Sequence, residues 1–452
     1  MSEYKDESQE QASNQKKNAK NIDRREFLVK SLGLGAAAIG GSFLGVNALG
    51  GAKSAIAEGE SDSNEADSLD IKSQSEMPVK ISDDYVRMEQ KNIIFARGSA
   101  GDPIVAPHYG AFAQKTMGII PPSDEAGFTQ KDRALERAGW AMMDYAAPRN
   151  SAGIRDIGVY SWHDFKPVET KWDFKDSVEA SDTVKRAASF LGADDVGITE
   201  FDERWVYNNF FNYTTKESEY EDFPFKVTNV IAMVYEMDYD AFRTAPTLIE
   251  SAGAGYCYSR MAETGHKVAT FIRKLGYNAI ACGNCTALSV PIAIQAGLGE
   301  IGRNGLLIHP RFGPRVRINK IFTDLPMQID KPITFGVREF CKSCKKCAIA
   351  CPSQAISYDD EPSMSGPTIS NCNGVEKWYI DPEKCVQSWG EFGGDCGSCI
   401  ASCPYNKLEV WNHELSKLMT RTPARPILKK FDDLFGYGKT YNTKEITKFW
   451  EL

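Results

Sequence analysis

The chain has 452 residues, a formal net charge of −8, and 42% hydrophobic and 25% charged residues. This length allows two or three domains with their own cores, and the composition is that of a soluble globular protein. The acidic balance argues against a nucleic-acid-binding protein, which needs a basic face. Beyond the N-terminal region, no apolar stretch reaches the roughly 18 residues that a membrane-spanning helix needs.

The first 57 residues are predicted to be a twin-arginine signal peptide. Arg24 and Arg25 form the arginine pair, a weakly apolar, glycine-rich run covers 32–49, and Ala55-Ile56-Ala57 offers a small-residue cleavage site. An ordinary basic amphipathic start is the alternative, but the three signals follow one another in the expected order. Because this route exports folded proteins, it suits a protein whose cofactor is inserted in the cytoplasm.

The middle of the chain alternates between helical and strand patterns, which predicts a mixed α/β domain. Ser181-Asp182-Thr183 is expected to cap the first helix, and Gly265 is expected to allow a close approach on the apolar stripe of the longest one. We expect helices at 181–191, 247–275 and 289–296, and strands at 195–199, 227–235, 278–282, 305–308 and 315–319.

Two familiar cofactor motifs are not supported. Gly297-x-Gly299-x-x-Gly302 has the spacing of a dinucleotide-binding loop, but it follows a predicted helix instead of a strand. The Asp-x-His-x-x-Gly loop that gives cobalt a histidine ligand in some cobamide enzymes does not occur in the sequence.

Nine of the twelve cysteines lie between Cys341 and Cys403, and their spacings are typical of cluster ligands instead of disulfides. The run Cys341-x2-Cys344-x2-Cys347-x3-Cys351-Pro matches the run with which bacterial ferredoxins bind [4Fe–4S] clusters. Structural zinc would favour two separate CxxC pairs. The first run therefore predicts iron–sulfur clusters.

A second, looser run has Cys385, ten further residues, and then Cys396-x2-Cys399-x3-Cys403-Pro. In two-cluster ferredoxins the last cysteine of each run binds the other cluster. Two such clusters form an electron path, so either the protein is a carrier or an acceptor lies before the clusters. The rule predicts one cluster on Cys341, Cys344, Cys347 and Cys403, and a second on Cys385, Cys396, Cys399 and Cys351.

The other cysteines are assigned no cluster. Cys372 needs no role, and Cys257 lies far upstream. Cys282-Gly-Asn-Cys285 has CxxC spacing, which we interpret as small buried side chains, with a redox pair as the less favoured alternative.

The combination of motifs resembles the respiratory reductive dehalogenases of anaerobic bacteria over nearly the whole chain. The resemblance rests on the twin-arginine pattern, on Gly299-Glu-Ile-Gly-Arg-Asn-Gly-Leu-Leu-Ile308, on Phe312-Gly-Pro-Arg-Val-Arg317, and on the two cysteine runs. It implies an α+β fold, in which a nitroreductase-like domain binds a corrinoid (a cobamide) base-off and a two-[4Fe–4S] bacterial-ferredoxin-like domain follows. A base-off corrinoid takes no histidine from the protein, in agreement with the missing loop.

The resemblance also implies an order of domains along the chain. We expect a signal peptide at 1–57, an N-terminal extension at 58–160, the corrinoid-binding domain at 161–335, the ferredoxin-like domain at 336–410, and a C-terminal extension packing on the core at 411–452.

The family pattern places a tyrosine acid, an asparagine and a basic residue above the corrin. Tyr258, Asn284 and Arg317 fit this order, Arg303 competes with Arg317 for the basic position, and Gly302, Arg303 and Asn304 are expected to bind the cofactor. A guanidinium would stabilise the phenolate that remains after a tyrosine gives up its proton. The ordinary alternatives are a core tyrosine, a turn asparagine and a strand arginine paired with an acid.

The implied activity is reductive dehalogenation, the terminal step of organohalide respiration, with electrons passed through two [4Fe–4S] clusters to the corrinoid. The implied partners are a halogenated organic substrate, a small integral membrane anchor and an upstream quinol or other redox donor, without nucleic acid; a homodimer is left open. The implied location is peripheral, at the outer face of the cytoplasmic membrane.

The aromatic-rich region 160–212 favours chlorinated aromatics such as chlorophenols as substrates, ahead of chlorinated alkanes or alkenes, although the same aromatic residues would also fit a core. They are Trp162, Trp172, Trp205, Tyr207, Phe210 and Phe211. Two other functions stay open: an exported iron–sulfur electron-transfer protein without its own substrate, and an enzyme similar to epoxyqueuosine reductases. The export signal and the acidic balance count against the second.

Overall fold

The computed structural model describes residues 71–116, 123–146, 158–408 and 437–451. All of them belong to one compact unit, Leu69–Leu452, so the predicted corrinoid-binding and ferredoxin-like segments fold together. The predicted signal peptide at 1–57 lies outside the described residues, and the boundaries expected between domains remain predictions.

A four-stranded antiparallel sheet forms the centre of the fold, in the order β2-β5-β9-β6. Long runs of β-branched and apolar residues explain why these segments form buried strands. The strands are β2 (Asp195–Glu200), β5 (Asn229–Glu236), β6 (Ala279–Cys282) and β9 (Val316–Thr323). The antiparallel sheet and its covering helices confirm the predicted α+β class.

Each face of this sheet has its own hydrophobic core. Alternate residues of β5 point to opposite faces, so Ile231 and Met233 contact the helices on one side while Val230 and Ala232 join the core on the other. Helices α6 (Ser177–Leu191) and α8 (Leu248–Lys274) contribute to the first core, and α9 (Ser289–Gln295) contributes to the second.

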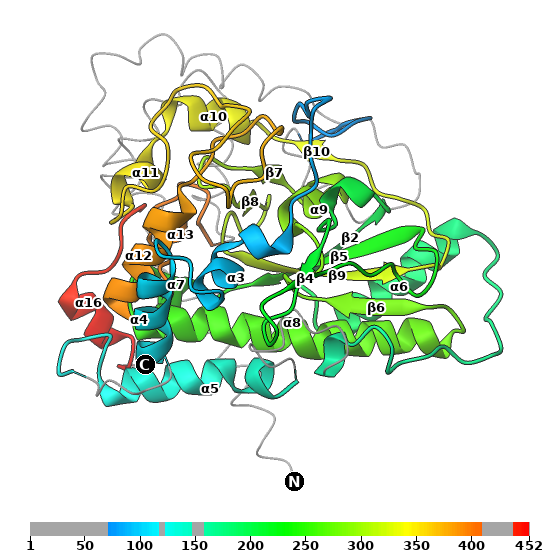
Figure 1. The fold of residues 1–452 in the computed structure, drawn as a ribbon, viewed down its shortest axis with the longest axis horizontal. Helices are drawn as coiled ribbons and strands as arrows, with labels where there is room; N and C mark the ends of the chain where they lie inside the picture. Colours follow the sequence, from blue (N-terminus) through cyan, green and yellow to red (C-terminus); the bar gives the residue numbers. More distant parts are fainter. Residues whose placement is uncertain (1–70, 117–122, 147–157, 409–436, 452) are drawn as a thin grey trace, which may run out of the picture. The chain divides into compact units, whose positions relative to one another are not determined.

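Helix α8 is the long helix that the apolar stripe predicted. Thr247 caps it, and a Cβ atom on Gly265 would lie 2.6 Å from Asn319 Nδ2 of β9, so the predicted close approach is confirmed. Helix α5 (Gln130–Ala146) runs along the other side of α8 (Figure 1). The helices are joined where Ser259 Oγ donates a 2.7 Å hydrogen bond to the carbonyl of Gly139.

Two predicted element limits differ from the structure by four residues, and the other limits agree to within two residues. Helix α6 is capped by Asp176, whose carboxylate accepts from the N–H groups of Val178 and Glu179, so Ser181 lies inside the helix. Strand β9 extends to Thr323 because residues 320–323 pair with both β5 and β6.

The remaining elements surround this centre (Figure 1). The short strands form three pairs: β1 (Lys72–Ser73) with β10 (Ile333–Thr334), β3 (Phe210–Phe211) with β4 (Ser218–Glu219), and β7 (Glu300–Ile301) with β8 (Leu307–Ile308). The other helices before the cysteine runs are η3 (Gln90–Asn92), α3 (Ile94–Ser99), α4 (Ala106–Thr116), η5 (Gly158–Tyr160), η6 (Glu203–Trp205) and α7 (Tyr239–Arg243). The helices within and after the cysteine runs are α10 (Val337–Ser343), α11 (Lys346–Ala350), α12 (Pro382–Phe392), α13 (Ser398–Ala401) and α16 (Thr443–Lys448).

The described part of the C-terminal extension contacts helices α7 and α5. Tyr441 Oη donates to Asp240 Oδ1 at 3.0 Å, and Trp450 Nε1 donates to Asp132 Oδ1 at 2.8 Å. Within the described ranges, no helix is both long and apolar enough to cross a membrane.

Candidate active site

Tyr258, Asn284 and Arg317 meet at one phenolic oxygen, although they come from three different elements. Asn284 Nδ2 donates a hydrogen bond of 2.8 Å to Tyr258 Oη, and Arg317 Nη1 lies 3.5 Å from the same oxygen. The guanidinium carbon of Arg317 also lies 4.9 Å from the centre of the tyrosine ring, within cation–π range. Asn284 is exposed and Tyr258 partly exposed, so a small molecule can reach this group.

The fold fixes these three side chains by a small number of contacts. Arg317 and Asn319 lie on the face of β9 that faces α8, and Asn319 Nδ2 donates to the carbonyl of Met261 at 2.8 Å. This bond fixes α8 against the strand one turn beyond Tyr258. Asn284 lies in the loop between β6 and α9, directly after the strand ends at Cys282.

Trp140 of α5 covers the ring of Tyr258. The two rings stack with centroids 4.9 Å apart and an interplanar angle of 22°. A Cβ atom on Gly255 would lie 2.4 Å from Trp140 Cδ1, so only glycine at 255 lets the indole lie against α8. The sequence did not point to Trp140, because nothing in the pattern of α5 distinguishes it from a core tryptophan.

The buried Glu250 and the partly exposed Asp395 affect the pKa of the arginine. Burial acts to lower the pKa of Arg317, but Tyr258, Asp395 and Glu250 together raise it, so the guanidinium stays charged. Burial and the neighbouring Asp395 raise the pKa of Glu250 to about 8, while Arg317 acts in the opposite direction. Glu250 lies against Gly397, between two cysteines of the second run, and no sequence motif marked Glu250 as part of the site.

Arg303, the competing basic residue, lies elsewhere. It is 1% exposed, it donates to the backbone carbonyls of Cys341, Ser357 and Asp359 at 2.7–3.1 Å, and its guanidinium lies over Trp378. These hydrogen bonds hold the backbone of the first cysteine run, and the basic residue at the tyrosine is Arg317.

Gly302 and Asn304 lie at the turn of the β7–β8 hairpin. A Cβ atom on Gly302 would lie 2.9 Å from Asn304 Oδ1, so a larger residue would displace the side chain of Asn304. Asn304 Oδ1 accepts from Leu306 N at 3.3 Å, whereas its buried Nδ2 has no hydrogen-bond partner. A buried, unpaired donor is costly, about 1–3 kcal/mol, unless a bound group accepts from it.

None of the eight cysteines of the two runs forms a disulfide, and the cysteines that affect one another's pKa fall into two groups. Burial is the main cause that raises the pKa of Cys403 and of Cys385. Cys347, Cys341 and Cys344 raise the pKa of Cys403 further, and Cys396 and Cys351 raise that of Cys385 further. Cys399 is influenced by Cys396, Cys385 and Cys351, and also by Cys347 of the other group. These neighbours are those of the crossed assignment, which remains a prediction.

The thiols fit an iron–sulfur cluster chemically. Burial raises the pKa of Cys347 and of Cys385 to about 12, so a bound metal is needed to stabilise the thiolates. In the described part of the chain, no three His, Cys, Asp or Glu side chains lie close enough to share one ion. A cubane has four irons with one thiolate each, so its ligands stand further apart than those of a single ion.

Comparisons with known proteins decide the family. Residues 340–407 match a family model described as a 4Fe-4S dicluster domain. The chain is 39% identical over 388 residues to a tetrachloroethene reductive dehalogenase of Dehalobacter restrictus, which covers 71% of this chain and 70% of that protein. This chain belongs to the reductive dehalogenases.

Two further comparisons agree with the assignment. A tetrachloroethene reductive dehalogenase of Sulfurospirillum multivorans is 35% identical over 72% of this chain and 71% of its own length. A solved reductive dehalogenase, whose structure was reported to suggest a mechanism for B12-dependent dehalogenation, has the same fold with a TM-score of 0.66 at 24% identity. That match covers 84% of this chain and 50% of the solved chain, so this reductive dehalogenase spans about half the length of that structure.

Three further cysteines of this reductive dehalogenase lie outside the two runs and inside the core around the sheet. Cys257 and Cys282 are fully buried, and Cys285 is partly exposed. A hydrogen bond from Cys282 is the main cause that lowers the pKa of Cys285, to about 6, and the ammonium of Lys320 acts in the same direction.

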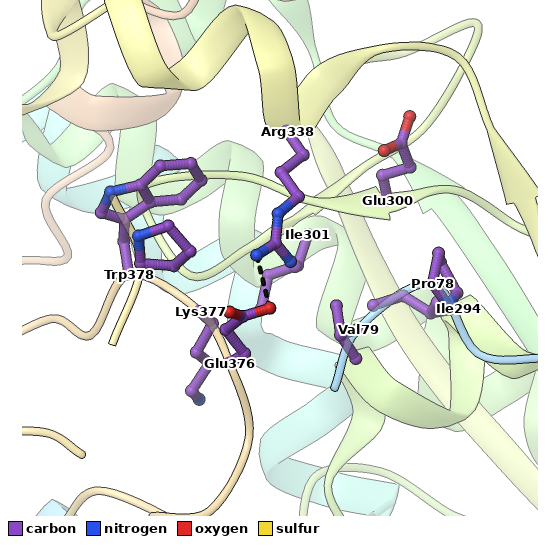
Figure 2. A pocket seen from close by; sticks show the side chains of 10 residues that line it. Pro78, Val79, Ile294, Glu300, Ile301, Arg338, Glu376, Lys377 and Trp378 are labelled. Atoms are coloured by element: carbon purple, nitrogen blue, oxygen red, sulfur yellow. Dashed lines mark hydrogen bonds and ion pairs between the residues drawn. The ribbon is translucent and has the colours of Figure 1, made fainter. Parts of the chain in front are cut away.

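A small pocket lies beside the first cysteine run of the reductive dehalogenase, away from Tyr258. Ile301, Arg338, Glu376 and Trp378 are among its lining residues, and Figure 2 shows Arg338 directed at Glu376, to which it is bound at 2.6 Å. Tyr258, Asn284 and Arg317 do not line it; the pocket lies between β7, Arg338 of α10 and the segments 78–79 and 376–378.

Proposed function

We propose that this reductive dehalogenase replaces a carbon–halogen bond by carbon–hydrogen with Tyr258 as proton donor. The net reaction is R–X + H⁺ + 2e⁻ → R–H + X⁻, so the protein must supply one proton and two electrons. The observation that carries the proposal is the meeting of Asn284 and Arg317 at the phenolic oxygen of Tyr258.

Each of the three side chains has a distinct task in this scheme. Asn284 donates its N–H to Tyr258 Oη and so occupies a lone pair, which leaves the phenolic hydrogen free to point to the substrate. An unperturbed tyrosine, with a pKa of about 10, is a weak acid. The charged Arg317 beside it stabilises the phenolate that forms as the proton leaves.

The proposed cofactors are two [4Fe–4S] clusters and a base-off corrinoid. When bound, the clusters supply one-electron carriers and the corrinoid supplies a reducible cobalt that cleaves carbon–halogen bonds. Asn304, with its unpaired Nδ2, and Gly302 would hold the corrinoid. Arg303 would act on the cluster side, because it fixes the backbone at Cys341.

We propose a chlorinated alkene as the substrate. The relatives that are 39% and 35% identical are named tetrachloroethene reductive dehalogenases. The aromatic residues that favoured chlorophenols give that preference less support, because Trp162, Trp205 and Phe210 are buried in the core around β5 and Trp172 is 58% exposed.

The test is a substrate screen on the anaerobically purified protein, with reduced viologen as electron donor. Iron and cobalt are counted first, and we expect about eight irons and one cobalt per chain. Chloride release from tetrachloroethene, and none from chlorophenols, is the expected result. Full iron content without corrinoid and without chloride release from any substrate would instead favour the electron-transfer protein.

We also propose that the chain is exported by the twin-arginine route and acts as a peripheral protein at the outer face of the cytoplasmic membrane. The arginine pair and the small-residue site at 55–57 support this location. A small integral anchor would hold the enzyme there, and a quinol or another redox donor would reduce it. N-terminal sequencing of membrane-associated protein should begin near residue 58, and an intact N-terminus in the cytosol would contradict export.

A further inference from the structure

Lys320 is a fully buried lysine on β9, and its ammonium is directed at the loop that carries Asn284. Its side chain is 0% exposed. Nζ donates to the carbonyl of Gly283, to the carbonyl of Ala287 at 3.2 Å, and to Ser289 Oγ at 2.8 Å. All three acceptors lie in the segment 283–289, so one ammonium fixes both ends of this loop.

A buried ammonium is costly to maintain unless the contacts around it compensate for lost hydration. Burial lowers the pKa of Lys320 to about 8, while the neighbouring Cys282 and Cys285 act in the opposite direction. A threonine or serine could donate to one carbonyl without the free-energy cost of burying a charge. The residue type therefore fits a need for three donors at one point.

The loop that Lys320 holds is connected to the acid by two more hydrogen bonds. Ser289 Oγ donates to Asn284 Oδ1 at 3.4 Å, and Asn284 Nδ2 donates to Tyr258 Oη at 2.8 Å. Lys320 pairs across the sheet with Cys282, the last residue of β6, so its backbone also fixes the start of the loop.

Strand β9 thus contributes one side chain to the site from each of its two faces. Arg317 lies on the α8 face and contacts Tyr258 directly, while Lys320 lies on the opposite face and reaches the tyrosine only through the loop. We propose that Lys320 is a positioning residue for dehalogenation: it holds the loop 283–289 so that the amide of Asn284 meets the phenolic oxygen of Tyr258. This proposal rests on the proposed roles of Tyr258 and Asn284.

The test is a double-mutant cycle between Lys320→Met and Asn284→Ala, with rates divided by the measured iron and cobalt content. Each single variant should lower kcat by about 10- to 100-fold and change KM by less. If Lys320 acts through Asn284, the kcat of the double variant should be less than about twofold below the kcat of Asn284→Ala alone. A further loss of about tenfold or more in the double variant, or an unchanged rate in Lys320→Met, would overturn the proposal.

Two additional variants keep the test decisive if Lys320→Met does not fold. Ser289→Ala removes the link between the ammonium and Asn284 and leaves the buried charge in place. It should lower kcat in the wild type but should cause no further decrease when Asn284→Ala is already present. Thr323→Val is the matched control, because Thr323 is equally buried on β9 and donates to the carbonyl of Asn278 at 2.6 Å, outside the loop. It should leave kcat within about twofold of the wild type. An additive Ser289→Ala effect, or an equal loss in Thr323→Val, contradicts the proposal.

Crystal structures of Lys320→Met, or of Ser289→Ala where the former does not fold, give a measurement that needs no turnover. Asn284 Nδ2 should move beyond about 3.5 Å from Tyr258 Oη, the limit for a hydrogen bond, while the stack of Trp140 on Tyr258 is retained. An unmoved Asn284 would contradict Lys320 as a positioning residue whatever the substrate is. Failure of the wild type to dehalogenate, with Asn284 displaced in the variant, would contradict only the proposed function.

Discussion

The guanidinium carbon of Arg317 lies 4.9 Å from the ring centre of Tyr258, and Nη1 of the same arginine lies 3.5 Å from the phenolic oxygen. One side chain thus contacts both the face of the ring and its hydroxyl. Such a placement stabilises negative charge on the phenolate more than it stabilises the neutral phenol. The predictions for Tyr258 and Arg317 follow from this relationship.

Tyr258→Phe should retain the fold and the cofactors and should lower kcat by about 10²- to 10⁴-fold, because the proton donor is removed while the ring remains stacked on Trp140. Chloride release with reduced viologen measures the effect. Tyr256→Phe is the matched control, since Tyr256 lies on the same helix but is 58% exposed. A near-normal rate for Tyr258→Phe would mean that the proton comes from another group.

Arg317→Lys should keep a positive charge but lower kcat/KM by about 10- to 100-fold, because an ammonium lacks the planar group that lies over the ring. Arg204→Lys serves as the control, since that arginine forms a half-exposed ion pair with Asp202. Equal activities of the wild type and Arg317→Lys would show that a single point charge is enough.

The crossed ligation predicts which cysteine variants lose the same cluster. Cys351→Ser and Cys385→Ser should give the same paramagnetic spectrum after reduction, and Cys403→Ser should match Cys341→Ser instead. Each should lose up to about four irons. Cys372→Ser should keep all of its iron, because Cys372 belongs to neither group. If the spectrum of Cys351→Ser matched that of Cys341→Ser, the ligands would not be crossed.

Cys285 should be alkylated at a lower pH than an ordinary thiol. Because the pKa of Cys285 is lowered to about 6, the thiolate persists until the pH falls to this value. An unperturbed thiol is already protonated below a pH of about 8.5. Peptide mass spectrometry after iodoacetamide pulses between pH 5 and pH 9 measures the midpoint. Lys320→Met should raise this midpoint, and a midpoint near that of free cysteine in the wild type would contradict the thiolate.

The same peptides distinguish the two interpretations of Cys282-Gly-Asn-Cys285. A peptide that labels only after reduction and is lighter by two hydrogens would show a redox pair. Two thiols that are both free in air-exposed protein would favour the small buried side chains that the spacing first suggested.

The regular parts of the fold could be predicted because their local patterns agree with their environment. The stripe on α8 and the apolar run of β5 were sufficient to place those elements, and Gly265 was correctly assigned to a close approach. The cap of α6 was missed because several capping residues compete within a few positions, and local sequence does not choose between Asp176 and Ser181.

The candidate site could be predicted only in part. The family pattern supplied Tyr258, Asn284 and Arg317, and the structure brings them together. Arg303 has the same chemistry as Arg317, so only its contacts with the backbone at Cys341 separated the two. Trp140 comes from a distant helix, whereas Glu250 and Lys320 share α8 and β9 with Tyr258 and Arg317. No single-sequence pattern states which buried residues face one another across a sheet or between helices.

Helix α8 connects the second cysteine run to the proposed proton donor, Tyr258. Glu250 lies against the loop after Cys396, and Tyr258 follows eight residues later on the same uninterrupted helix. Eight residues of α-helix form a rod of about 12 Å. The rise and rotation of the helix fix the position of Tyr258 relative to the loop after Cys396. One residue inserted between Glu250 and Tyr258 would rotate the tyrosine about the helix axis by roughly 100°. Natural variation in length should accumulate in the surface loops and spare these two turns.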